Sequence, residues 1–93
     1  MGQIELNITT DLTSLPQDAA SAMCAITISG LVGATYKPLL YIGKQVAKGT
    51  NYWFIAEQTL VTQNTIKRIV KLKVNAFNGI YALVPTSIED IFA

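Results

Sequence analysis

Apolar and polar residues alternate with a period of two over much of the chain, a pattern that predicts β-strands. In residues 3–9 the alternation is regular, with Ile4, Leu6 and Ile8 on one side and polar residues on the other. This arrangement is typical of a half-buried strand. We therefore expect these three apolar side chains to contribute to the core.

A helical period replaces the alternation in residues 16–30. The expected core face of this helix is lined by small and apolar residues, namely Ala19, Ala22, Met23, Ile26 and Gly30. Ser14 stands where an N-cap is needed, with Gln17 three residues later and Pro16 in the first turn. The sequence therefore predicts one helix that begins near Pro16 and lies close against a sheet.

Further strands are predicted after the helix, over residues 39–47, 52–60, 66–76 and 80–85. The connections between them are short, and Asn78-Gly79 favours a two-residue hairpin turn between the last two. In the strand predicted over residues 66–76, Val70, Leu72 and Val74 occupy the positions that should face the core. The expected fold class is α+β, with one helix packed on an antiparallel sheet of about four to five strands.

The composition fits a single domain over residues 1–93 with few charges on its surface. Charged residues are 14% of the chain, against about 25% in an average soluble domain. Such a surface predicts apolar or uncharged patches that bind partners. The basic residues Lys67, Arg68, Lys71 and Lys73 alternate with aliphatic ones, which indicates the solvated face of a strand. With a net charge of +1, no nucleic-acid partner is expected.

The residue types that usually carry catalysis are scarce. The chain has no histidine, and Cys24 lies in the predicted helix on the flank of its core face, so we interpret it as a structural thiol. The adjacent carboxylates Glu89 and Asp90 lie in a short tail, where a paired-carboxylate site is not expected. We therefore expect no enzymatic activity, no metal and no cofactor, which leaves binding, inhibition and scaffolding.

Two features bear on the location of the protein. A single cysteine excludes an intrachain disulfide and fits a reducing compartment. The first residues lack a basic region followed by a long apolar run, and no apolar run approaches the length of a membrane span. We expect a cytoplasmic protein, or the mature form of a secreted one with its signal removed, and no membrane association.

One stretch carries a family resemblance. The sequence QVAKGTNYWF, residues 45–54, resembles the first inhibitory hairpin of the cystatins, in particular the disulfide-free stefins, which carry Q-x-V-x-G followed by T-N-Y and a second aromatic residue. The order of a helix followed by strands joined through hairpins is also similar to that family. The resemblance implies a cystatin-like fold and inhibition of papain-like cysteine proteases by a wedge inserted into the active-site cleft.

The resemblance further implies which residues would form the wedge. Carried over to this chain, the protease-binding residues would be Gly2, Gln45, Val46, Ala47, Lys48, Gly49 and Phe77. Ala47 stands where the family has its central Val, and residues 76–79 read AFNG in place of Pro-Trp or Leu-Pro. Tyr52 and Trp53 would anchor the base of the first hairpin, one on each face of the strand.

The alternative is a non-inhibitory interaction or self-associating module on the same fold. It rests on the low charge, on apolar residues on both faces of the strands 39–47 and 52–60, and on Ile28, which lies on the otherwise polar face of the helix. A homodimer could form if the first hairpin opened and two copies exchanged strands. A small-molecule or nucleic-acid binder is the third interpretation and rests only on the Lys-rich strand and the aromatic residues.

Overall fold

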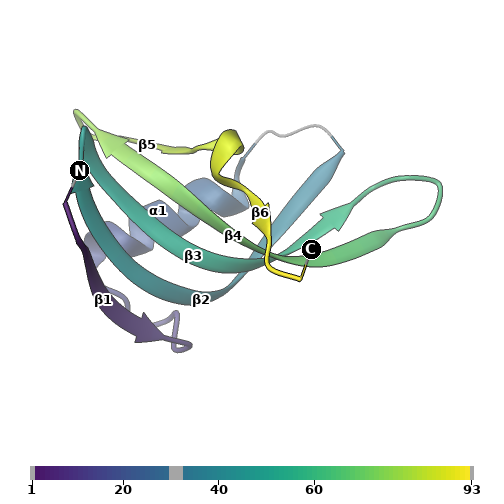
Figure 1. Ribbon diagram of the computed structural model, residues 1–93, viewed down its shortest axis with the longest axis horizontal. Coiled ribbons are helices and arrows are strands. Elements are labelled where there is room, and N and C mark those ends of the chain that lie inside the picture. Colours follow the sequence, from purple (N-terminus) through teal and green to yellow (C-terminus); the bar gives the residue numbers. More distant parts are fainter. Residues whose placement is uncertain (1, 30–32, 93) are drawn as a thin grey trace.

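In the computed structural model, residues 2–29 and 33–92 are described, and an antiparallel sheet curves around one α-helix (Figure 1). The elements in chain order are β1 (Ile4–Thr9), α1 (Gln17–Thr27), β2 (Ala34–Ala47), β3 (Gly49–Leu60), β4 (Ile66–Phe77), β5 (Ile80–Leu83), a 3-10 turn (Pro85–Ser87) and β6 (Glu89–Asp90). The strand order is β1-β2-β3-β4-β5, and the short β6 also pairs with β4. The α+β class with one helix on an antiparallel sheet is confirmed.

The core lies between α1 and the strands that it covers. Its largest fully buried side chains are Phe54, Ile26, Leu72, Val70 and Val74. Ala19 and Ala22 are also fully buried, and their small size allows the helix backbone to approach the sheet closely. The predicted core faces of the helix and of β4 are confirmed at these positions. Met23 is only partly buried, and Gly30 lies outside the described residues.

The start of α1 differs from the prediction. Ser14 does not cap the helix, because its hydroxyl donates a hydrogen bond to Oδ2 of Asp11 at 2.8 Å. The N-cap residue is Pro16, which has no side chain to cap with, and the helix begins at Gln17. A carboxylate three residues upstream therefore bonds the hydroxyl that a capping box would need.

The first half of β2 also differs from the prediction. The strand was expected to begin near Leu39, after Pro38, but it begins at Ala34 and includes the proline. The pairing of β2 with β3 shifts register between Pro38 and Leu40, so the proline lies at a bulge. Leu39 is the extra residue of this bulge, and Pro38 before it still pairs with Ala56. A proline without an N–H is tolerated beside such an irregularity.

Strand β1 has the predicted alternation but not the predicted burial. The apolar side chains of Ile4, Leu6 and Ile8 are 37%, 66% and 61% exposed. Leu6 pairs with Gly43, and Gly43 pairs with Trp53. Directly paired residues share a face of the sheet, so Leu6 lies on the face of Trp53, which is opposite α1. The expectation of a half-buried strand is therefore wrong, because the helix covers the opposite face of the sheet.

Candidate functional site: the hairpin tip

Three segments that are distant in sequence meet at one end of the sheet, at the left of Figure 1. They are Gly2, residues 45–49 where β2 turns into β3, and residues 76–80 where β4 turns into β5. We call these three segments together the hairpin tip. They include every residue that the cystatin resemblance assigned to protease binding.

The N-terminal segment is bound to the first hairpin by hydrogen bonds. The N–H of Gly2 donates to the carbonyl of Val46 at 2.7 Å. Nε2 of Gln45 donates to the carbonyl of Gly2 at 3.0 Å. Both backbone groups of Gly2 are therefore bonded to β2, and the segment continues the line of β1 to the tip.

The first hairpin requires a glycine for two separate reasons. Gly49 has a φ of +84°, a conformation that residues with a Cβ adopt at a cost. A Cβ at this position would also overlap the carbonyl oxygen of Ala76 in β4. Glycine thus allows a tight turn after Lys48 and lets the two hairpins approach each other at backbone distance.

The second hairpin turns at Asn78 and Gly79, as the sequence predicts. Their φ angles are +52° and +77°, the pair of positive values that a type I′ turn requires. Phe77 pairs with Ile80 across this turn. The Lys48 Nζ lies 5.9 Å from the centroid of the Phe77 ring, within the range of a cation–π interaction.

A row of amide side chains supports the tip from below. Asn75 donates from Nδ2 to the carbonyl of Lys48 and to Oδ1 of the buried Asn51, both at 3.0 Å. Trp53 donates from Nε1 to Oε1 of Gln45 at 3.2 Å. Asn51 donates from Nδ2 to the same oxygen of Gln45 at 3.5 Å, and the Gln45 side chain holds Gly2. One network therefore reaches from β4 to the N-terminal segment.

The structure adds Asn51 and Asn75 to the residues that the sequence indicated. Asn51 matches the T-N-Y part of the motif, but Asn75 belongs to no motif and is an isolated amide in an otherwise apolar and basic strand. The two residues are directly opposite each other in the pairing of β3 with β4. Only this pairing register brings the two amides together, and the register cannot be read from a local sequence pattern.

The two aromatic residues at the base of the first hairpin lie on opposite faces of β3. Tyr52 is buried on the side of α1. Trp53 is on the other side, and the ammonium groups of Lys71 and Lys73 lie over its ring at 5.6 and 5.4 Å from the centroid. This placement agrees with the predicted alternation. The lysines cover the indole on the face that has no helix.

Tyr52 also connects the hairpin to the helix. Its hydroxyl donates to Oδ2 of Asp18 at 2.8 Å, and the Lys44 ammonium lies 3.7 Å from the same oxygen. Partial burial tends to raise the pKa of Asp18, but the hydrogen bonds from Tyr52 and from the Ala19 N–H, with the charge of Lys44, hold it below its usual value. Burial, and next the hydrogen bond to Asp18, raises the pKa of Tyr52.

The outward surface of the tip is mainly apolar. Val46 is 66% exposed, Phe77 is 38% exposed and Ile80 is 70% exposed. A shallow hollow of about 400 Å³ beside the second hairpin is lined by Asn75, Phe77, Asn78, Ile80 and Ala82. Lys48 is the one charged residue among the segments of the tip.

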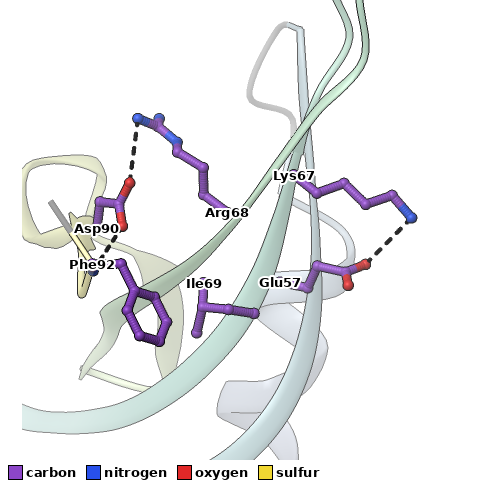
Figure 2. Close-up of a pocket in the computed structure, with 6 residues that line it drawn as sticks. All are labelled: Glu57, Lys67, Arg68, Ile69, Asp90 and Phe92. Carbon is purple, nitrogen blue, oxygen red and sulfur yellow. Dashed lines mark hydrogen bonds and ion pairs between the residues drawn. The ribbon is translucent and has the colours of Figure 1, made fainter.

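A second depression, of about 330 Å³, lies near β6 and the C-terminal residues (Figure 2). Its charged groups are paired with one another, because Arg68 lies 3.8 Å from Asp90 and Lys67 lies 3.9 Å from Glu57. Arg68 also donates two hydrogen bonds to Oε1 of Gln58, at 3.0 and 2.8 Å. The charged side chains of this depression are thus bound to one another or to Gln58, and we assign no ligand to it.

The remaining chemistry of the described residues is sparse. Cys24, which was interpreted as a structural thiol on the flank of the core face, is exposed and does not contribute to the core. Within residues 2–29 and 33–92, no three histidine, cysteine or carboxylate side chains are grouped as metal ligands. The helix in this part of the chain is also too short and too polar to span a membrane.

The hairpin tip is therefore the part of the molecule where separate segments are organised into one surface. Hydrogen bonds join Gly2 to β2, and Asn75 joins β4 to the first hairpin. No protein-family model, curated protein or solved structure matches this chain.

Proposed function

We propose that the protein has a cystatin-like fold and inhibits papain-like cysteine proteases by inserting the hairpin tip into the active-site cleft. The observation that carries the proposal is the joining of the N-terminal segment to the first hairpin, and of the first hairpin to β4, at one end of the sheet. The wedge that the resemblance implies needs these three segments side by side. Here they come from residues 2, 45–49 and 76–80, which lie far apart in sequence.

Rigidity of the tip supports the proposal on physical grounds. Each immobilised side chain or loop costs free energy on binding, and a segment that is already ordered in the free protein avoids much of that cost. The turn at Gly49 is held against Ala76, and the carbonyl of Lys48 is held by Asn75. The tip can therefore enter a cleft with little loss of conformational entropy.

The exposed apolar side chains supply the contact area. Ala47 is smaller than the valine of the family motif, so Val46 and Phe77 must provide more of the apolar surface. Burying a side chain of this size contributes about 1.5–3 kcal/mol. Substrate would be excluded by occupancy of the cleft alone, without a bond to the catalytic cysteine of the protease.

The first experiment is a titration of active papain with the purified protein, followed by hydrolysis of a small fluorogenic substrate. We expect reversible inhibition that raises the apparent KM of the substrate and leaves its kcat unchanged. Full papain activity at high micromolar concentrations of the protein would contradict the proposal.

A matched pair of variants tests whether the tip is the binding surface. Val46 and Val61 are exposed to nearly the same extent, at 66% and 65%, but Val61 follows β3 at the opposite end of the sheet. We expect Val46→Asp to weaken inhibition by about tenfold or more, as loss of an interface anchor does. Val61→Asp should inhibit as the wild type does. Equal inhibition constants for the two variants would exclude the tip.

A further inference from the structure

We propose that β1 pairs with β1 of a second copy of this chain, so that two sheets join into one across a two-fold axis at Leu6. The proposal does not depend on protease inhibition, because it concerns the side edge of the sheet and not the hairpin tip. Strand order places β1 at one end of the path β1-β2-β3-β4-β5, with β2 on one side. Its other side is an edge that can accept a further strand.

The edge lacks most of the features that keep sheet edges apart. Proteins commonly protect an edge strand with lysine, proline or inward-pointing charges. Strand β1 has the sequence IELNIT, with Glu5 as its single charge. Its pairing with β2 does contain an irregularity between Leu6 and Thr9. All of its residues except the partly buried Thr9 are exposed, and they include three large aliphatic side chains on one face.

The sequence of β1 is complementary to itself in one antiparallel register. With the axis at Leu6, this residue faces Leu6 of the second copy, and Ile4 faces Ile8 on both sides of the axis. Three apolar cross-strand pairs then lie on the sheet face opposite α1. On the other face, Glu5 lies opposite Asn7, so the two carboxylates do not meet.

Neighbouring registers are less favourable for physical reasons. An axis at Glu5 places the two Glu5 carboxylates directly opposite each other, which is destabilising. An axis at Asn7 pairs Ile4 with Thr10, beyond the end of the strand, and retains only two apolar pairs. The self-complementary register therefore specifies a second copy as the occupant, since an unrelated strand would have to match this pattern by chance.

The surface beside β1 supports the same occupant. Ile4 borders a shallow hollow of about 250 Å³ that is also lined by Ile42, Gln45, Trp53 and Lys71. In the proposed register Ile8 of the second copy lies opposite Ile4, across the free edge of β1, and extends the apolar surface that borders this hollow. The net charge of the chain is +1, so long-range repulsion between two copies is small.

Sedimentation equilibrium over a range of concentrations tests the dimer. We expect the wild type to associate to a dimer and Leu6→Lys to sediment as a monomer, because it places two ammonium groups together on the axis. The control is Ile28→Lys, which changes another aliphatic residue, 79% exposed, at the end of α1. This variant should dimerise as the wild type does. A monomeric wild type at millimolar concentration would overturn the proposal.

Cross-linking tests the register and does not rely on loss of binding. Directly opposed residues in an antiparallel pair have Cα atoms about 4.5–5.5 Å apart, which a disulfide can span. In a Cys24→Ser background, which removes the single native thiol, Leu6→Cys should form a covalent dimer on mild oxidation. Glu5→Cys, whose two copies would be diagonal to each other, should cross-link much less.

The same variants separate this dimer from one formed by strand exchange. An exchanged dimer would persist in Leu6→Lys and would give no preference for cross-linking at position 6, and either result would overturn the proposal. Inhibition of papain by Leu6→Lys should equal that of the wild type, since Leu6 is outside the hairpin tip. Failure of the protein to inhibit papain would therefore not count against the dimer. A monomeric protein would likewise not count against inhibition.

Discussion

At the scale of single residues, Gly49 determines how closely the two hairpins of the tip can approach. Its positive φ and its contact with the Ala76 carbonyl are two separate demands on one position. Gly79, in the second hairpin, meets only the first demand, because its φ is +77° but no atom lies within 4 Å of where its Cβ would be. Comparing the two glycines therefore separates two free-energy costs of a Cβ: its overlap with Ala76, which arises only at Gly49, and its left-handed backbone conformation, which arises at both.

Replacing each glycine by alanine should measure this difference. We expect Gly79→Ala to lower the free energy of unfolding by about 1–2 kcal/mol, the cost of a left-handed backbone for a residue with a Cβ. Gly49→Ala should cost about 3 kcal/mol or more, because β4 must also move away from the first hairpin. Urea unfolding of both variants gives the comparison. Equal losses would mean that the contact with Ala76 does not constrain the tip.

At the scale of elements, the sequence predicts where strands and turns lie better than it predicts which elements pack against them. Alternation in β4 and the Asn78-Gly79 turn were sufficient to predict a hairpin with Val70, Leu72 and Val74 facing the core. The same alternation in β1 gave the wrong burial, because a period of two defines two faces but not which one the helix covers.

The candidate site shows the same limit. Gln45 and Gly49 could be proposed from a local motif, and the contacts within the first hairpin follow from a short turn. The hydrogen bonds from Asn75 to Asn51 and Lys48 depend instead on the register between β3 and β4. Register is set by packing over the whole strand, so these supporting residues could be found only from the structure.

The connection between α1 and the sheet gives a prediction for acid stability. The folded protein holds the pKa of Asp18 below its usual value, so this carboxylate stabilises the fold above its unfolded pKa of about 4. The contribution is lost as the pH falls through the lowered folded pKa. We expect Asp18→Asn to lower the free energy of unfolding by about 1 kcal/mol at pH 7, the value for a hydrogen bond to a partly exposed charge.

The pH dependence distinguishes this effect from a general loss of packing. The difference between Asp18→Asn and the wild type should shrink as the pH falls below about 4 in urea unfolding followed by circular dichroism. Glu89→Gln provides the control, because Glu89 is exposed and its ion pair with Lys71 is at the surface. It should change stability by less than about 0.5 kcal/mol at pH 7. A difference for Asp18→Asn that is constant with pH would contradict the role of its charge.

At the scale of the whole molecule, the buried tyrosines make the stability of the fold depend on pH in the alkaline range. Burial, and next the charges of Asp18 and Glu5, raises the pKa of Tyr41 to about 12. Tyr52 is shifted in the same direction, whereas both phenols titrate near pH 10 when the chain unfolds. A raised folded-state pKa means that their stabilisation is complete below pH 10 and is lost as the pH rises through the folded value.

We therefore expect the free energy of unfolding to be flat between pH 7 and 9 and to fall above pH 10, by up to about 1.4 kcal/mol per pH unit for each shifted tyrosine. Urea midpoints measured every half pH unit give this slope, and absorbance at 295 nm follows the phenolates. Tyr41→Phe should reduce this slope by about the contribution of one tyrosine, because phenylalanine has no proton to lose in the unfolded state. If Tyr41 and Tyr52 instead ionised near pH 10 in the folded protein, both would be open to solvent. The sheet would then not be closed over the helix at the level of these two residues, and the hydrogen bond from Tyr52 to Asp18 that connects the first hairpin to α1 would be open to solvent.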